Sequence, residues 1–134
     1  MFRLVKIENG RINQPEPRKL GVTASETYTL GEALVLSGGA PPKGGATAQP
    51  AFIAGEDYTA PASGARKITV YPVQAGMVFE TTVTAAPTAL TAGSTVTLSS
   101  DGLGVTATTA SGVATVYDLA GATAAGDTLL VTFR

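Results

Sequence analysis

The chain of 134 residues carries ten acidic and nine basic side chains, for a net charge of −1, and 44% of its residues are hydrophobic. This balance argues against nucleic acid and anionic membranes as partners, and no stretch approaches the roughly 20 apolar residues of a membrane helix. The sequence has no cysteine and no histidine, which excludes disulfides, thiol catalysis and imidazole-based catalytic or metal sites.

The first 22 residues differ from the rest of the chain and are predicted to form an extended arm. Residues 2–8 alternate imperfectly, as a strand with one apolar face does, and Asn9-Gly10 supplies a turn. Pro15 and Pro17 then favour an extended, polyproline-like path. The segment has no apolar secretory core, so we expect no signal peptide.

Basic residues are concentrated in this arm, which holds five of the nine: Arg3, Lys6, Arg11, Arg18 and Lys19. After Lys67 no basic residue follows in the sequence until Arg134. The arm is therefore either solvated beside a neutral body, or it meets an acidic surface on a partner. Composition leaves both interpretations open.

Residues 23–134 are predicted to form the β domain, because Gly and Pro interrupt any long helix and the abundant Thr and Val favour strands. A first unit, 23–73, contains strand patterns at 28–36, 51–54 and 67–73. A second unit, 77–134, has further short strand patterns, at 77–83, 95–98, 105–108, 114–119 and 129–133. Short strands separated by frequent turns are typical of a small β-barrel or β-sandwich, so the fold class is all-β.

A weak internal repeat relates the two units. Gly31 aligns with Gly93 and Leu34 with Val96, an offset of 62 residues in both cases. The same offset aligns Ile68 with Leu130 and Tyr71 with Phe133. An offset that is maintained over about forty residues indicates two related β units.

The sequence predicts no catalytic, metal or cofactor site. Its acids are scattered, and the adjacent pair Glu56-Asp57 falls in a predicted turn, where we expect a solvated surface. A paired-carboxylate site from the later acids is disfavoured, because Asp101 and Asp127 lie beside turn glycines and are expected to bond their own backbone. The glycine pairs at 38–39 and 44–45 lack the signature of a phosphate-binding loop.

Three motifs follow the basic arm in order: Tyr-x-x-Gly-Glu-Ala-Leu-x-Leu at 28–36, Pro-x-Phe-Ile at 50–53 and Ile-x-Val-Tyr-Pro-Val at 68–73. This order, with a Gly-rich loop after the first motif, resembles that of tailed-phage capsid decoration, or cement, proteins. The resemblance covers most of residues 2–134, and its motifs are patterns of small and apolar residues rather than chemical signatures.

The resemblance implies a structural protein of the virion that is made in the host cytoplasm and binds the major capsid protein on the outer surface of the mature head, which it stabilises. It also implies a barrel or sandwich, often assembled as a homotrimer, with an N-terminal segment that contacts the capsid. We therefore expect the arm to anchor the protein to the capsid. Its apolar side chains would be buried against the shell, and its basic side chains would contact acidic patches on the capsid. The anchoring residues would be Phe2, Arg3, Leu4, Val5, Lys6, Ile7, Arg11, Arg18 and Lys19.

Two alternatives fit the same Thr-rich, low-charge strands. One is an adhesin-like or carbohydrate-binding β module, which the absence of tryptophan for stacking on sugars disfavours. The other is a different structural component of a phage head or tail, which composition does not distinguish from a decoration protein.

Overall fold

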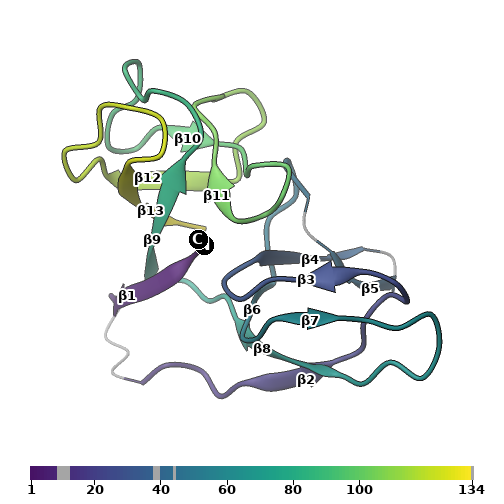
Figure 1. Ribbon diagram of the computed structural model, residues 1–134. Helices are drawn as coiled ribbons and strands as arrows, with labels where there is room; N and C mark the ends of the chain where they lie inside the picture. Colours follow the sequence, from purple (N-terminus) through teal and green to yellow (C-terminus); the bar gives the residue numbers. More distant parts are fainter. Residues whose placement is uncertain (9–12, 38–39, 44, 134) are drawn as a thin grey trace.

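The protein is built from strands and turns, and the described residues contain no helix (Figure 1). The computed structural model describes residues 1–8, 13–37, 40–43 and 45–133. Its strands are β1 (Arg3–Ile7), β2 (Arg18–Leu20), β3 (Thr27–Tyr28), β4 (Ala33–Ser37), β5 (Ala40–Lys43), β6 (Phe52–Ala54), β7 (Tyr58–Thr59), β8 (Ile68–Pro72), β9 (Met77–Val83), β10 (Thr95–Val96), β11 (Gly104–Val105), β12 (Ala114–Asp118) and β13 (Thr128–Thr132). The all-β class predicted from the sequence is confirmed.

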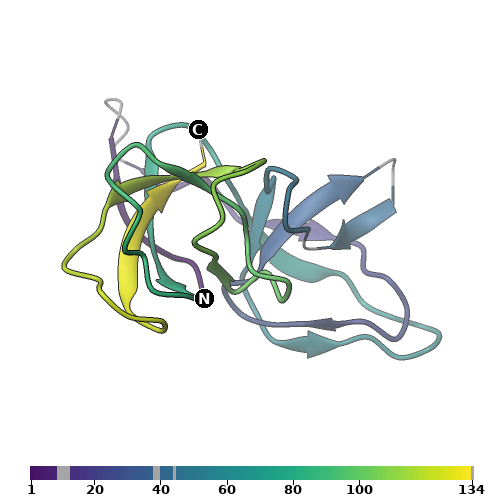
Figure 2. The same cartoon turned by 90° about the horizontal axis from the view of Figure 1, so that it is seen from above.

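The strands form two main sheets. The first has the order β2-β8-β6-β4-β5, and the second has the order β1-β9-β13-β12-β10, with β11 beside β9 in parallel. Strands β3 and β7 make a separate two-stranded ribbon. Each sheet belongs to one lobe, and the lobes lie side by side (Figures 1 and 2). Neither sheet closes on itself among the described strands, so the fold is a pair of open sheets and not a closed barrel.

The two sheets share one register pattern. Ala33 of β4 pairs with Ile53 of β6, and Thr95 of β10 pairs with Thr115 of β12, 62 residues later at both positions. The turn before each pair also repeats: Gly31 and Gly93 have φ angles of 79° and 93°. This left-handed conformation is open to glycine without a steric penalty. The repeat is therefore present in the backbone as well as in the sequence.

In the third strand of each unit the offset shortens by one residue. Ile68 and Leu129, 61 residues apart, are both fully buried, whereas Leu130 is only half-buried. The sequence alignment of Ile68 with Leu130, and of Tyr71 with Phe133, is therefore wrong by one position. Side chains alternate between the two faces of a strand, so a slip of one residue exchanges the core face for the solvent face.

The fourth strand extends the first unit toward the N-terminus. Lys19 of β2 pairs with Thr69 of β8, and Glu80 of β9 pairs with Leu130 of β13, again 61 residues later at both positions. Strand β2 is thus the counterpart of β9. Arg18 and Lys19 belong to the first sheet and not to an arm that ends at residue 22.

Residues 2–7 also differ from the expected extended arm. Strand β1 pairs antiparallel with β9, and Phe2 is only 3% exposed. The Phe2 ring lies 6.5 Å from that of Phe79, edge to face, and 5.3 Å from that of Phe133. Phe79 and Phe133 also contact each other, with ring centres 5.5 Å apart, so the three rings pack as one aromatic cluster in the core beneath the second sheet. The arm expectation is wrong here because Phe2 is needed by the protein's own core.

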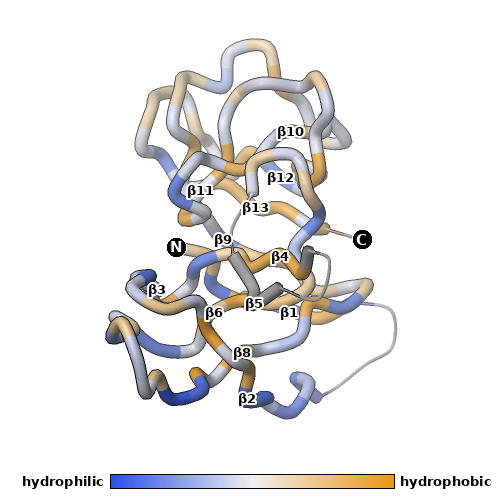
Figure 3. Tube along the Cα trace, turned by 90° about the vertical axis from the view of Figure 1, so that its right-hand side faces the viewer, coloured by the Kyte–Doolittle hydropathy of each residue, from blue (hydrophilic) through white to orange (hydrophobic). Residues whose placement is uncertain are grey.

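Each lobe has its own hydrophobic core. The core of the first lobe consists of Tyr28, Leu34, Phe52, Ala54, Ile68 and Val70. The larger core of the second lobe includes the Phe2–Phe79–Phe133 trio and continues across the contact between the lobes to Ala33, Ile53 and Val73 of the first unit. Figure 3 shows apolar stretches on the strands of both lobes and hydrophilic stretches in the loops near β2. Backbone hydrogen bonds join the lobes, for example from the Ala33 N–H to the Gly102 C=O at 2.8 Å, so the two units are in direct contact.

Candidate binding surface

Four exposed basic residues lie along the β2–β8 border of the first sheet and define what we call the cationic face: Arg18, Lys19, Arg66 and Lys67. Because side chains alternate along a strand, Arg18, opposite the buried Val70, points to the other side of the sheet from Lys19, opposite Thr69. The four residues come from two segments that are distant in sequence and that the antiparallel pairing of β2 with β8 brings together. Lys67 immediately precedes β8 and lies beside the Leu20 end of β2. The fold thus concentrates charge that the sequence distributes over two segments.

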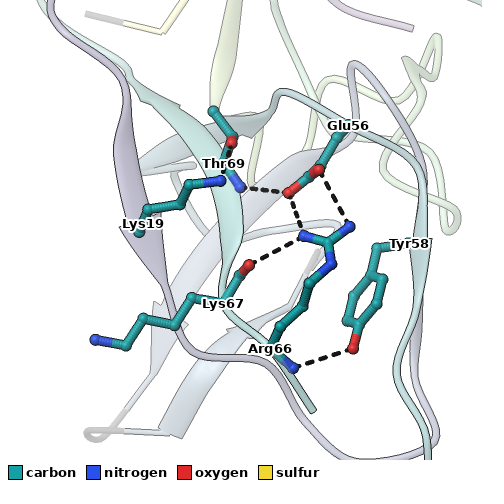
Figure 4. Close-up of polar contacts among 6 residues, drawn as sticks. All are labelled: Lys19, Glu56, Tyr58, Arg66, Lys67 and Thr69. Atoms are coloured by element: carbon teal, nitrogen blue, oxygen red, sulfur yellow. Dashed lines mark hydrogen bonds and ion pairs between the residues drawn. The ribbon is translucent and has the colours of Figure 1, made fainter.

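Arg66 is held in a fixed position by Glu56 and Tyr58 (Figure 4). The guanidinium contacts both carboxylate oxygens of Glu56, at 2.9 and 3.3 Å, and lies 4.2 Å from the centre of the Tyr58 ring. The Thr69 N–H donates a further bond to Glu56 Oε1 at 2.8 Å. Arg66 and then this backbone bond lower the pKa of Glu56 from 4.5 to about 2. Glu56 was expected to be merely solvated, and instead it positions Arg66.

The other three cations of the face form no ion pair with a described carboxylate, although the Lys19 charge also helps to lower the pKa of Glu56. Lys19 Nζ donates to Thr69 Oγ1 at 2.7 Å, which is a bond to a neutral hydroxyl (Figure 4). Among the described side chains, no carboxylate forms an ion pair with Arg18, Lys19 or Lys67. The face therefore presents net positive charge to an incoming partner, although the protein as a whole is close to neutral.

The basic residues of β1 lie in the other lobe and are paired within the protein. Arg3 contacts Glu80 at 2.8 Å. Lys6 Nζ lies 2.9 Å from Glu8 Oε1 and donates to the Tyr117 hydroxyl at 2.6 Å. The same hydroxyl donates to Glu8, and it is the main reason why the pKa of Lys6 is raised and that of Glu8 is lowered. These charges are already compensated and offer little to a partner.

The nine residues predicted to bind a shell therefore do not form one site. Phe2 is buried, and Leu4 and Ile7 are partly buried against the core of the second lobe. Val5 is exposed, while Arg18 and Lys19 lie on the cationic face. Arg3 and Lys6 are paired on the second sheet, as described above, and Arg11 is outside the described residues. The geometry retains Arg18 and Lys19 and adds Arg66 and Lys67, which the sequence analysis did not include.

A groove of about 410 Å³ lies where the two lobes meet, beside β1. Its walls are mainly apolar and include Leu30, Ile53, Met77 and Phe79. Among the described residues that line it there is no carboxylate, and the one charged side chain is that of Arg3, which is paired with Glu80. The groove offers apolar contact and no acid–base pair.

Asp101 and Asp127, which might have formed a catalytic pair, each cap a turn instead. Asp101 accepts bonds from the Ser99 hydroxyl and the Leu103 N–H, which lower its pKa. Asp127 accepts from the N–H groups of Thr123 and Ala124, and its pKa is lowered for that reason. The expectation that both acids bond their own turns is confirmed. No group of three or more potential metal ligands occurs in the described part of the chain.

The described residues also include no helix with the length and apolar character needed to cross a membrane. Comparison of the chain with protein-family models, with curated proteins and with solved structures found no match. The class that the described fold and surface define is thus an open-sheet β protein with an internal repeat and a cationic face.

Proposed function

We propose that this chain is a structural protein of a tailed-phage virion that coats the outer surface of the assembled capsid and stabilises it. The resemblance of its motifs to decoration proteins suggests this role. The observation that carries it is the cationic face, where three exposed cations lack a carboxylate partner among the described side chains. Its binding partner would be an acidic area on the major capsid protein.

The proposed mechanism is physical. A protein that binds the assembled shell but not its separated subunits stabilises the shell by mass action. At a free concentration 100-fold above Kd, the gain is about 2.7 kcal/mol per site. A homotrimer, which the resemblance implies, would present three cationic faces at high effective concentration and so strengthen the attachment.

The proposal replaces the anchoring arm by a surface of the folded body. Phe2, Leu4 and Ile7 are occupied by the protein's own core and are not available to a shell. Arg18, Lys19 and Lys67 speed the encounter and orient the docked body by complementing acidic charge. Attachment should therefore weaken as ionic strength rises, because exposed charges are screened over about 8 Å at physiological salt.

Cosedimentation with purified heads that lack the protein tests this proposal. The wild-type protein should bind heads but not dissociated capsid subunits, and should raise the temperature at which the heads release their contents. The variants Lys19→Glu and Lys67→Glu should bind less, whereas Lys6→Glu, which makes the same charge change on the other lobe, should bind like the wild type. Equal binding to separated subunits, or no binding to heads, would refute the proposed function.

A further inference from the structure

The free edge of the first sheet has a counterpart that is covered in the same molecule. Strand β2 ends the order β2-β8-β6-β4-β5, and in Figure 1 it lies at the border of its lobe. Its counterpart β9 is not at an edge, because β1 pairs with it antiparallel on the side away from β13. The side of β9 away from β13 thus accommodates β1 in antiparallel pairing at residues 77–80 and β11 in parallel at residues 82–83. At Glu80, the counterpart of Lys19, the added strand is the antiparallel one.

The backbone of Lys19 faces this free edge. The Thr69 N–H donates to Glu56 Oε1 at 2.8 Å, and the Thr69 C=O accepts from the Gly55 N–H at 2.9 Å. Both groups of Thr69 therefore point toward β6, and the residues on either side of it point toward β2. Lys19 lies opposite Thr69. Its own N–H and C=O consequently point away from β8, toward the open side of the sheet.

The second lobe shows the same geometry with the edge filled. The Val83 N–H donates to the Asp127 C=O at 3.0 Å, and the Val83 C=O accepts from Gly126 at 2.7 Å, so Val83 faces β13. By alternation Glu80, the counterpart of Lys19, faces β1. Arg3 lies directly opposite Glu80 in the register, and their side chains meet at 2.8 Å.

The charge at this position is reversed between the lobes. The covered edge carries Glu80 and receives a strand with Arg3 opposite it. The free edge carries Lys19, with Arg18 beside it and Lys67 at the end of the neighbouring strand. Opposite charges directly across two strands stabilise the pairing, and like charges destabilise it. The complementary strand for β2 therefore carries Asp or Glu opposite Lys19.

We propose that the β2 edge binds an extended acidic segment of a partner protein by strand addition. The added strand runs antiparallel to β2, bonds to the Lys19 N–H and C=O, and places a carboxylate opposite the Lys19 side chain. This inference rests on the proposed function only in naming the capsid as the source of the segment. The segment is short, because Pro17 has no N–H to donate on one side of Lys19.

A second copy of this chain is a poor occupant of the edge. Its β1 would place Arg3 opposite Lys19 if it were added as in the second lobe, which juxtaposes like charges. Its β1 is also already paired to β9, and Phe2 is buried beside it. The positive charge of Lys19 thus favours an acidic segment of a different protein as the strand added to β2.

Two matched peptides test the inference. Both alternate valine and threonine, and they differ only at the central residue, which is glutamate in one and lysine in the other. The glutamate peptide should bind the wild-type protein about fivefold more tightly. Binding should slow hydrogen exchange at the Lys19 amide, which faces solvent in the free protein, and should leave the already bonded Thr69 amide unchanged.

Two substitutions separate strand addition from general attraction. Lys19→Glu should reverse the preference between the peptides. Lys19→Pro removes both the outward N–H donor and the ammonium group without touching the β2–β8 bonds, and proline is tolerated at such edge positions. This variant should keep its thermal stability and bind neither peptide, whereas loss of the charge alone would leave binding of the lysine peptide intact or stronger. Lys67→Glu, the matched charge control, should weaken binding of the glutamate peptide without reversing the preference for it over the lysine peptide.

Each outcome has a definite meaning. The inference is overturned if Lys19→Pro binds like the wild type, if Lys19→Glu and Lys67→Glu weaken both peptides equally, or if heparin and single-stranded DNA bind as well as the glutamate peptide. Peptide binding without head binding would leave the inference intact and refute the proposed function. Head binding that Lys19→Pro weakens no more than Lys67→Glu does would support the function and refute the inference.

Discussion

Replacement of Phe2 by alanine distinguishes a structural first strand from a detachable arm. Phe2 is 3% exposed, and its ring lies 5.3 Å from Phe133 and 6.5 Å from Phe79. Burying a phenylalanine contributes about 1.5–3 kcal/mol, and an aromatic pair adds about 0.5–1.5 kcal/mol. Core Phe→Ala changes cost about 3–5 kcal/mol. Because the chain end relaxes more easily than a central strand, we expect a loss near 3 kcal/mol in the free energy of unfolding.

Urea denaturation measures this loss directly. The midpoint for Phe2→Ala should fall with an unchanged m-value, since the surface exposed on unfolding changes little. Val5→Ala is the control on the same strand: Val5 is 40% exposed, and its truncation should cost under about 0.5 kcal/mol. Hydrogen exchange should also show β9 amides losing protection in Phe2→Ala. A Phe2→Ala loss as small as that of Val5→Ala would refute the integrated strand and restore the arm.

Three further outcomes follow from the geometry. The pKa of Glu56 is about 2 in the folded protein and 4.5 in its reference state. The contribution of Glu56 to stability is therefore full above about pH 4.5 and disappears as the pH falls toward 2. In urea unfolding, Glu56→Gln should lose part of the pH dependence that the wild-type protein shows in that range. Gly102→Ala should lower the thermal midpoint more than Gly121→Ala, because both glycines have positive φ (70° and 82°) but only the Cβ added at Gly102 meets neighbours, at 3.1 and 3.2 Å. Gly104→Ala should detach β11 from β9, seen as faster exchange of the Thr84 amide, because its Cβ would lie 2.6 Å from a backbone oxygen of β9.

Each of these outcomes has a result that contradicts it. An unchanged pH dependence in Glu56→Gln would show that the Arg66 pair does not contribute to folding. Equal thermal midpoints for Gly102→Ala and Gly121→Ala would mean that the contact between the lobes near Gly102 adjusts to the new methyl group without loss of stability. Wild-type exchange at Thr84 in Gly104→Ala would show that β9 moves to admit the new methyl group.

The local pattern was sufficient to predict most of the strands. The alternation at 77–83 coincides with β9, and those at 114–119 and 129–133 match β12 and β13 to within a residue or so. The strand patterns at 95–98 and 105–108 are joined by a turn that brings Leu98 into a bridge with Val105. These elements are predictable because side-chain alternation and turn glycines act within a few residues of the chain.

The sequence alone did not determine which strands pair or where the N-terminal residues lie. Residues 2–8 have a strand pattern that fits a free arm as well as an edge strand, and the outcome depends on the space between Phe79 and Phe133. That space forms only when β9 and β13 are side by side.

The candidate site depends on tertiary structure for the same reason. The Arg66-Lys67 dipeptide has no local feature that indicates binding. It becomes part of a candidate binding surface only because the β2–β8 pairing brings it close to Arg18 and Lys19. The sequence by itself determined most of the strand-forming segments and indicated their internal repeat, through short-range alternation and turn chemistry. The tertiary structure decided which charges are compensated and which sheet edge is free, because both depend on contacts between residues far apart in the chain.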